Sequence, residues 1–450
     1  MRNSQFRWLA FGLAITLISC DSTTNMKTYQ DIQLTDDDSG HHINSTQAFS
    51  PDNQWVAYDS RNEKTGINEA GEVAMVNVNT GEIKTLYRTE NQTEFGPGLG
   101  AVTFSPVENT VLFIHGIRNA SEQNPYSMTR RTGVAIQTAN PQVPLFLDAR
   151  DMTAPFTAGA LRGGTHAHTW SGDGKWISYT YNDYLIEQAE KAGKSVKDLR
   201  TIGVMIPGES VKVSDEATLE NNNGELFSTL IVNVVDEPKP GTDEVDKAFD
   251  ECFVGKDGYI RTDGSKQTRA VAYQGNVRDI NGKTVTQIFV ADLPDDLLEL
   301  AKVMPISADP SVRLPVSDAI KTRRITNLEN GVSPAPRHWL RSSSDGKFIG
   351  FLSKDANEII QFFVVSPNGG EAVQVTNHEF SIDSPFNFSS DGTKVAYIAD
   401  GSVFITEVAS RKSQRVTEKA VDDRRPVISV VWSNDDTMLA YNRLVKKGYS

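Results

Sequence analysis

The sequence predicts an all-β protein folded as a single β-propeller, because one short motif recurs along most of its 450 residues. The first residue of the motif is apolar or polar, the second is Ser, and Asp and Gly usually follow. An aromatic residue stands nine positions after the first residue. Six copies share this frame, at 49–58, 104–113, 170–179, 342–351, 388–397 and 432–441. The last three copies start 46 and 44 residues apart, which suits one four-stranded blade each.

Each copy predicts a strand, a tight turn and a returning strand. The Ser-x-Asp-Gly group forms the turn, where Gly or Asn tolerates positive φ, and alternating residues such as 176–179 return alongside. One such sheet cannot bury both of its faces, whereas radial stacking buries the sheets against one another. We therefore expect seven four-stranded blades over residues 28–450, with six or eight blades as the alternatives.

The frame fades between the third and fourth copies. We place the rest of the third blade there, together with one degenerate blade built from 226–235, 268–274 and 286–292. Short helical insertions are expected at 184–199, 242–253 and 294–304. Residues 29–35 resemble the outer strands at 374–376 and 415–417, so we expect them to complete the last blade and close the ring.

The N-terminus has the pattern of a bacterial lipoprotein signal. Arg2 and Arg7 precede an apolar run at 8–18, which is too short to span a bilayer and ends before Cys20. Leu17-Ile18-Ser19-Cys20 resembles the lipobox, so we predict a signal peptide at 1–19, lipidation of Cys20 and a tether at 20–27. The alternative is an ordinary secretory signal with a chance cysteine. The expected location is the periplasmic side of the cell envelope, and Asp21 leaves the choice of inner or outer membrane open.

Composition excludes several classes of function. The net charge of −13 argues against nucleic acid, which proteins bind through clustered Lys and Arg. Cys252 is the second of two cysteines, so no internal disulfide is expected, and an inert packed thiol is the favoured interpretation. No nucleophile elbow, phosphate-binding loop or His-Glu-x-x-His motif occurs, which argues against a serine peptidase. We expect a monomer.

Histidines at matching repeat positions are the strongest candidates for chemistry. His166 and His168 enter one predicted strand, and their spacing of two places both rings on one face. His338 and His166 each lie four positions before their own copy, so the two rings would converge near the axis. His115 ends a second strand and could join them. Three histidines with an open position suit Zn or Mn, whereas hydrogen-bonded structural histidines are the alternative.

Charged residues beside these histidines are candidate ligand contacts. Arg162 and Arg337 precede the same strands and could present guanidinium groups to a carboxylate or phosphate. Asp151 and Asp183 lie near strand ends and could supply a carboxylate. For each of the four, a structural ion pair is the favoured alternative.

The repeats resemble the PD40, or WD40-like, repeats of TolB-type propellers, which have Asp-Gly in the first turn instead of a closing Trp-Asp pair. More closely, the chain resembles an uncharacterised enterobacterial family of TolB-like propellers, and this similarity covers nearly all of it after Cys20. The resemblance implies the fold and leaves the activity open, and the predicted lipid anchor departs from that family. The runs that carry it are 113–116, 151–156, 161–168, 180–183 and 336–339.

The chain is more distantly similar to oligogalacturonate lyase, a seven-bladed propeller that holds Mn and cleaves uronate saccharides by β-elimination. This resemblance implies His166, His168 and His338 as metal ligands, with no counterpart for that enzyme's glutamine. We favour a lipid-anchored propeller that binds a ligand or protein partner at its axial funnel. The alternative is a metal-dependent lyase for acidic saccharides, in which Arg162 or Arg337 clamps a substrate carboxylate.

Overall fold

The computed structural model describes residues 29–214, 218–421 and 424–444. The chain divides into two compact units, Met1–Ile32 and Gln33–Ser450. The predicted signal peptide at 1–19, the lipidated Cys20 and the tether at 20–27 lie outside the described residues. In the part that is described, no helix is long and apolar enough to cross a membrane.

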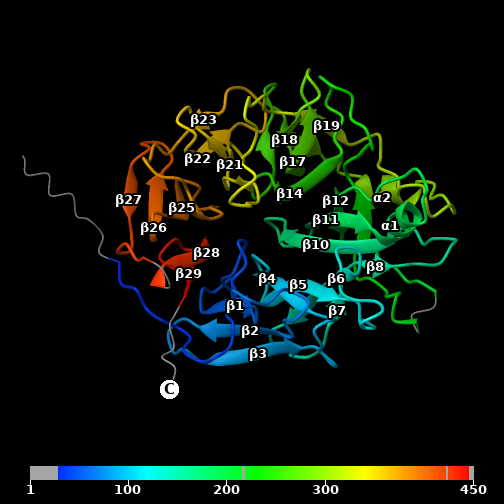
Figure 1. The fold of residues 1–450 in the computed structure, drawn as a ribbon, viewed down its shortest axis with the longest axis horizontal. Coiled ribbons are helices and arrows are strands. Elements are labelled where there is room, and N and C mark those ends of the chain that lie inside the picture. Colours follow the sequence, from blue (N-terminus) through cyan, green and yellow to red (C-terminus); the bar gives the residue numbers. More distant parts are fainter. Residues whose placement is uncertain (1–28, 215–217, 422–423, 445–450) are drawn as a thin grey trace, which may run out of the picture. The chain divides into compact units, whose positions relative to one another are not determined.

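Small antiparallel sheets stand in a ring within residues 33–450, which confirms the predicted all-β propeller (Figure 1). The strands of the first three sheets are β1 (Trp55–Asp59), β2 (Glu72–Asn77) and β3 (Ile83–Arg88); β4 (Leu99–Phe104), β5 (Thr110–Gly116), β6 (Arg131–Gln137) and β7 (Leu145–Phe146); and β10 (Gly163–Trp170), β11 (Ile177–Asp183), β12 (Thr201–Ile206) and β13 (Phe227–Leu230).

The remaining sheets continue around the ring in sequence order. Their strands are β14 (Lys247–Phe253), β17 (Ala270–Arg278), β18 (Thr284–Asp292) and β19 (Lys321–Arg324); β20 (Arg341–Ser342), β21 (Ile349–Lys354), β22 (Ile360–Val365) and β23 (Val373–Gln374); β24 (Asn387–Phe388), β25 (Lys394–Ala399), β26 (Ser402–Glu407) and β27 (Ser413–Arg415); and β28 (Pro426–Trp432) with β29 (Leu439–Arg443). Two short pairs are additional: β8 (Ala149–Arg150) with β9 (Ala160–Leu161), and β15 (Tyr259–Ile260) with β16 (Lys266–Gln267).

The blades are less uniform than predicted. Among the described residues, six sheets have three or four strands, and the pair β28–β29 stands between the sixth and the first of them (Figure 1). The expectation of seven four-stranded blades is therefore corrected to six sheets of that size plus one reduced, two-stranded sheet. The inner edge of the first sheet is likewise reduced to isolated bridges, His42 with Asp59 and Phe49 with Val56.

The repeated motif is a hydrogen-bonded turn. In five copies the Ser hydroxyl donates to the Asp carboxylate two residues later, at 2.5–2.8 Å, and accepts the N–H of the residue five positions on. These side-chain bonds reinforce the backbone hydrogen bonds of the same turn, such as those from the N–H of Ser50 to the carbonyl of Trp55 and from the N–H of Ser171 to the carbonyl of Trp176. The five Ser–Asp pairs are Ser50–Asp52, Ser171–Asp173, Ser343–Asp345, Ser389–Asp391 and Ser433–Asp435.

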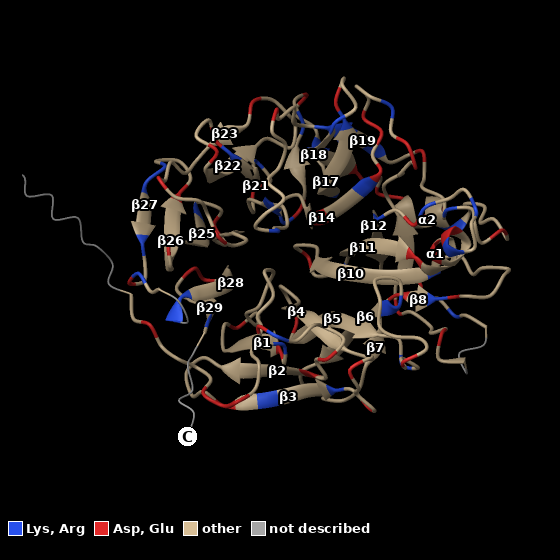
Figure 2. Ribbon diagram, in the orientation of Figure 1, with Lys and Arg blue, Asp and Glu red and all other residues tan. Residues whose placement is uncertain are grey.

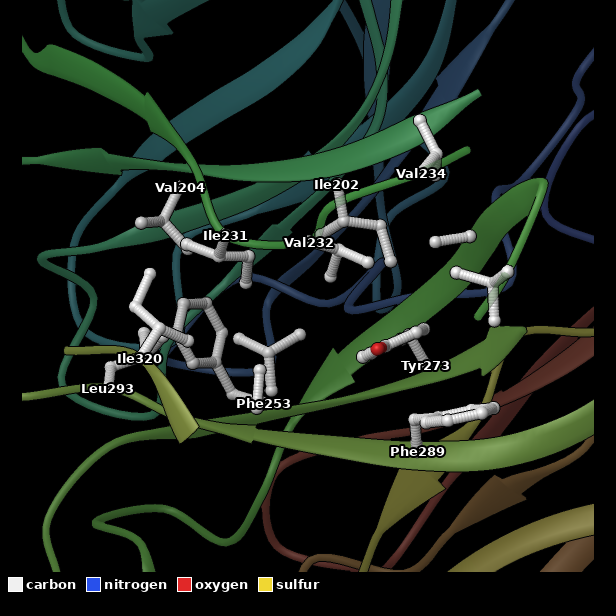
Figure 3. Close-up of a cluster of buried hydrophobic side chains, with 14 of the residues drawn as sticks. Ile202, Val204, Ile231, Val232, Val234, Phe253, Tyr273, Phe289, Leu293 and Ile320 are labelled. Carbon is white, nitrogen blue, oxygen red and sulfur yellow. The ribbon is translucent and has the colours of Figure 1, made fainter. Parts of the chain in front are cut away.

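The apolar core lies between neighbouring sheets. The cluster of Figure 3 joins the third and fourth sheets, where Ile202 and Val204 of β12 face Tyr273 of β17 and Phe289 of β18. The rings of Tyr273 and Phe289 stack with their centroids 5.4 Å apart. Each blade thus buries its faces against the next one, as the radial arrangement requires.

The ring closes without the predicted N-terminal strand. Residues 29–35 form no strand, and Ile32 is 62% exposed, so the assignment of 29–35 to the last blade is wrong. Side-chain amides close the ring instead: Asn442 accepts from the N–H of Ile43 at 3.0 Å, and Asn434 donates to the carbonyl of Ser50 at 2.9 Å. A segment of alternating apolar and polar residues is therefore not enough to form a strand when no neighbouring strand offers its edge for hydrogen bonding.

Two of the three helix predictions are confirmed in shorter form. The helix α1 (Tyr184–Lys191) lies within 184–199, and α2 (Leu297–Lys302) lies within 294–304. The third prediction is wrong, because most of 242–253 is β14, the inner strand of the fourth sheet. Of the proposed degenerate blade, 226–235 contributes β13 to the third sheet, whereas 268–274 and 286–292 overlap β17 and β18 of the fourth.

Candidate functional site

The two histidines of β10 point to opposite faces of their strand. A β-bulge interrupts the pairing between His166 and Thr169, and Ala167 has a φ of 59°. His168 Nε2 lies 3.0 Å from Thr165 Oγ1, whereas His166 Nε2 lies 3.4 Å from Asn182 Oδ1. The prediction that both rings share a face is wrong, because the bulge inserts an extra residue between them.

His338 is a structural histidine. Its Nδ1 donates to the carbonyl of Pro336 at 3.0 Å, and its Nε2 accepts from the N–H of Leu352 at 3.1 Å. Burial lowers the pKa of His338 to about 4, so the ring is neutral at physiological pH. Both nitrogens are used, and neither has a lone pair left for a metal.

The three predicted metal ligands do not form a common centre. Among the described residues, no group of three or more His, Cys, Asp or Glu side chains is placed to hold a metal ion. His115 does not complete one, since its Nδ1 lies 2.5 Å from the Gly116 carbonyl and its Nε2 3.2 Å from the Tyr87 hydroxyl. The arrangement of His166, His168 and His338 therefore does not suit the Zn or Mn ion that the sequence suggested.

Arg162 and Asp183 bind each other. Arg162 Nη2 donates to Asp183 Oδ2 at 2.7 Å, and the guanidinium is 1% exposed. The other oxygen of Asp183 accepts from the first N–H groups of α1, which makes Asp183 the N-cap of that helix. Asp151 is also structural, because its carboxylate accepts from the N–H groups of Thr153 and Thr157.

Arg337 remains accessible although it forms an ion pair. Its Nη2 donates to Asp250 Oδ1 at 2.6 Å, and its side chain is 51% exposed while that of Asp250 is 2% exposed. The guanidinium lies 4.7 Å from the centroid of the Trp339 ring. Among the four charged candidates, Arg337 alone is exposed to solvent, and it lies in the segment that precedes β20.

Arg131, at the start of β6, is a buried cation that the sequence analysis missed. Its residue is 4% exposed, its Nη1 donates to the Tyr126 hydroxyl at 2.9 Å, and its Nε contacts the Met128 carbonyl at 3.3 Å. Nη2 is buried and has no hydrogen-bond partner, and no described carboxylate pairs with this guanidinium. Burial lowers the pKa of Arg131 to about 10, and the side chain still carries its charge at neutral pH.

Two further cations, Arg200 and Lys247, form no salt bridge within the described residues, although the charge of Asp250 acts on both. Arg200 is partly exposed, and its Nε donates to Asn182 Oδ1 at 3.2 Å. Its two terminal nitrogens make no hydrogen bond to a described residue. Lys247, the first residue of β14, is partly exposed and lies 4.2 Å from the centroid of the Phe249 ring. Nothing in the repeat frame marks Arg131, Arg200 or Lys247, because each lies outside the recurring turn.

Three arginines act on the imidazole of His166. Burial lowers the pKa of His166 well below its usual range, and the charges of Arg131, Arg200 and Arg337 lower it further. Arg200 and Arg337 also lower the pKa of Arg131. We call Arg131, Arg200, Lys247 and Arg337, together with the neutral His166, the axial cation cluster. It is a concentration of positive charge in a chain whose net charge is −13.

Burial weakens the acidic groups that face the cluster. It raises the pKa of Asp198 to about 6 and that of Glu251 to about 7. Asp250 is held by Arg337. Elsewhere acidic and basic residues alternate along the loops, and the strands are mostly uncharged (Figure 2). The axial cluster therefore keeps an excess of positive charge near pH 7.

Comparison with known proteins places the chain in a family. It is 31% identical to the uncharacterised protein YidR of Escherichia coli (strain K12) over 416 residues, which covers 91% of this chain and 94% of that protein. The chain belongs to the YidR family. A family described as a protein of unknown function (DUF3748) also matches residues 98–220, which include Arg131, His166 and Arg200. The predicted membership of an uncharacterised family is confirmed at this level.

Three solved structures are similar to this YidR-family chain at low sequence identity. TolB from Acinetobacter baumannii is 12% identical, with a TM-score of 0.38 and coverage of 82% of this chain and 65% of that one. A putative TolB from Agrobacterium tumefaciens is 14% identical, with a TM-score of 0.40 and coverage of 83% and 99%. Oligogalacturonate lyase in complex with manganese is 11% identical, with a TM-score of 0.49 and coverage of 92% of each chain. At these similarities, function has to be argued from this chain's own residues.

Proposed function

We propose that this protein is a binding propeller that holds a small anionic ligand at the axial cation cluster, and that lipidation of Cys20 retains it on the periplasmic side of the cell envelope. The observation that carries the proposal is Arg131, a guanidinium that is 4% exposed and lacks a carboxylate partner. A buried charge without a partner is costly, and a ligand carboxylate or phosphate would supply the missing one.

The geometry around Arg131 favours recognition of a planar anionic group. The Tyr126 hydroxyl and the Met128 carbonyl hold Nη1 and Nε, which leaves Nη2 for a ligand. Arg200 offers its terminal nitrogens from the neighbouring blade. Guanidinium groups bind carboxylates and phosphates through paired N–H donors, so these two arginines suit either group.

His166 would act as a neutral hydrogen-bonding group in this site. Its pKa is held low by burial and by the surrounding arginines, so its ring adds no charge that would need compensation. Its Nε2 makes a long contact of 3.4 Å to Asn182, which a ligand oxygen could replace. The charges of the arginines would thus attract the ligand, and the imidazole of His166 would orient it.

The depth of Arg131 favours a small ligand over a protein surface. A protein partner would present acidic side chains to half-exposed groups such as Arg337 but would not reach a residue that is 4% exposed. An acidic saccharide carries accessible carboxylates and is a suitable ligand class. The lyase alternative is not favoured, because it needs a metal and His338 has both ring nitrogens hydrogen-bonded.

The test is titration calorimetry on the chain purified without residues 1–20, which leaves the compact unit Gln33–Ser450 intact. Phosphate, citrate and galacturonate are the probes. We expect at least one to bind, and Arg131→Gln and Arg200→Gln each to weaken it about tenfold or more. Arg411→Gln, an exposed arginine on a turn, is the matched control and should leave binding unchanged. Absence of binding by all three probes, or unchanged affinity in both variants, would overturn the proposal.

A further inference from the structure

We propose that a groove between the third and fourth sheets binds short peptides by their free termini, with Lys256 taking the carboxylate and Asp295 the ammonium group. The groove has a volume of about 530 Å³, within the range of about 300–1,000 Å³ that is typical of small-molecule sites. It shares no lining residue with the axial cation cluster, so the inference stands apart from the proposed function.

The groove lies at the opposite end of the third sheet from Arg200. Its wall on this sheet is formed by Asp173 and Trp176, in the turn that joins β10 to β11. Arg200 directly precedes β12, whose first residue pairs with Tyr181 near the far end of β11. Binding at the groove and binding at the axial cluster can therefore be tested separately.

An insertion in the fourth sheet supplies the other wall. Among the described sheets, only the fourth has an extra strand pair, β15–β16, between its first and second strands. The residues of this segment that line the groove are Lys256, Asp257, Lys266, Thr268 and Arg269, and Pro294 and Asp295 join them from the segment after β18. The groove is thus a product of the insertion and not of the repeat, and such surface insertions commonly carry binding sites.

Two ion pairs within the groove are already complete. Arg269 Nη2 lies 2.7 Å from Asp173 Oδ2, and the guanidinium lies 5.0 Å from the centroid of the Trp176 ring. Trp176 belongs to the buried apolar cluster between the two sheets, so this pair packs against the core. Lys266 Nζ lies 2.5 Å from Asp257 Oδ2. These four charges compensate one another, and none of them needs a ligand.

Lys256 and Asp295 are the charges that remain in the groove. Both are exposed, and neither forms a salt bridge with a described residue. The backbone of Lys256 is fixed, because its N–H donates to the Ser344 carbonyl at 2.9 Å and its own carbonyl lies against Gly172. The Asp295 carboxylate accepts from the Thr268 hydroxyl at 2.5 Å. The groove therefore presents one cation and one anion from anchored positions.

A ligand that matches these charges has one carboxylate and one ammonium group. A dianion would place a negative group beside Asp295, and a dication would place a positive group beside Lys256. Lys256 and Asp295 do not pair with each other, so the ligand has to hold its two charges apart. A short peptide with free termini does so, because its extended backbone separates them by about 3.3–3.6 Å per residue.

The test compares triglycine with N-acetyl-triglycine, which lacks the ammonium group, and with triglycinamide, which lacks the carboxylate. In titration calorimetry at pH 7 we expect triglycine to bind about fivefold more tightly than either blocked peptide, as one ion pair in a partly exposed groove implies. Lys256→Gln should abolish the preference over triglycinamide and retain the preference over N-acetyl-triglycine. Asp295→Asn should do the reverse.

Two control variants separate the groove from other charged surfaces. Lys283→Gln, an exposed lysine on the turn between β17 and β18, should retain both preferences, and so should Arg131→Gln in the axial cation cluster. Equal affinity for the three peptides, failure of triglycine to bind, or preferences that survive both Lys256→Gln and Asp295→Asn would overturn the inference. Preferences lost in Arg131→Gln and kept in Lys256→Gln would also overturn it, because they would assign the peptide to the axial cluster.

Discussion

Glu251 is a buried acid whose charge should cost stability, and Glu251→Gln should remove that cost. The residue is fully buried on β14, where its Oε2 accepts from the Thr180 hydroxyl of the neighbouring blade at 2.9 Å. Its Oε1 makes no hydrogen bond of good geometry, although the nearby Ser178 hydroxyl acts on the carboxyl and lowers its pKa slightly against the larger effect of burial. A protonated carboxyl or a glutamine amide can share a hydrogen bond with the Ser178 hydroxyl and carries no charge in this buried position.

The magnitude follows from the shift in pKa. Burial raises the pKa of Glu251 from 4.5 to about 7, so the folded state keeps a proton that the unfolded state releases between these values. Stability from this group is full below pH 4.5, falls as pH rises toward 7, and stays low above it. The loss is roughly 3 kcal/mol at 1.36 kcal/mol per pKa unit. Glutamine does not ionise, so the variant should be more stable than the parent by about this amount at pH 8 and by much less at pH 5.

Urea unfolding followed by tryptophan fluorescence at pH 5 and pH 8 measures the effect. The informative quantity is the difference between the two proteins at each pH, because other groups titrate equally in both. A matched control is Glu82→Gln, an exposed acid before β3, which should show no pH-dependent difference. If Glu251→Gln has the same advantage at pH 5 and pH 8, or none at either, the reasoning about a neutral buried carboxyl is refuted.

Two further substitutions test the structural assignments of candidate site residues. His338→Ala should lower the free energy of unfolding by roughly 2–4 kcal/mol, because the N–H of Leu352 loses its acceptor; bound metal, measured by mass spectrometry, should be the same as in the parent, and loss of a bound ion would instead revive the metal hypothesis. Arg162→Ala should cost roughly 3–5 kcal/mol in urea unfolding, because the Asp183 carboxylate loses its cation in a buried position; a cost below about 1 kcal/mol would contradict this assignment.

The propeller was predictable because its signal is local. Each Ser-x-Asp turn is closed by bonds between residues no more than five positions apart, so the same chemistry recurs visibly in the sequence. The helices α1 and α2 were found for the same reason, since caps and breakers lie next to them. The segment 242–253 shows the limit: the Pro-Lys-Pro-Gly break before it favoured a short helix, yet most of it is the strand β14, in which Asp250 is 2% exposed and paired with an arginine 87 residues away.

The candidate site depended on long-range contacts that the sequence does not display. A spacing of two placed His166 and His168 on one face, but the bulge at Ala167 separated them. The shared repeat position of His166 and His338 said nothing of the hydrogen bonds that occupy both ring nitrogens of His338. Arg131 carried no motif at all, and only its burial without a carboxylate distinguishes it from the other basic residues.

The sequence by itself determined the fold class, the turn chemistry and the order of the blades, because these depend on neighbours along the chain. The tertiary structure alone decided which charged and imidazole groups are already paired and which are free for a ligand. Pairing depends on partners brought together by folding from separate blades, and burial then sets how costly an unpaired charge is. That distinction separates Arg162, which is paired with Asp183, from Arg131, whose Nη2 has no hydrogen-bond partner.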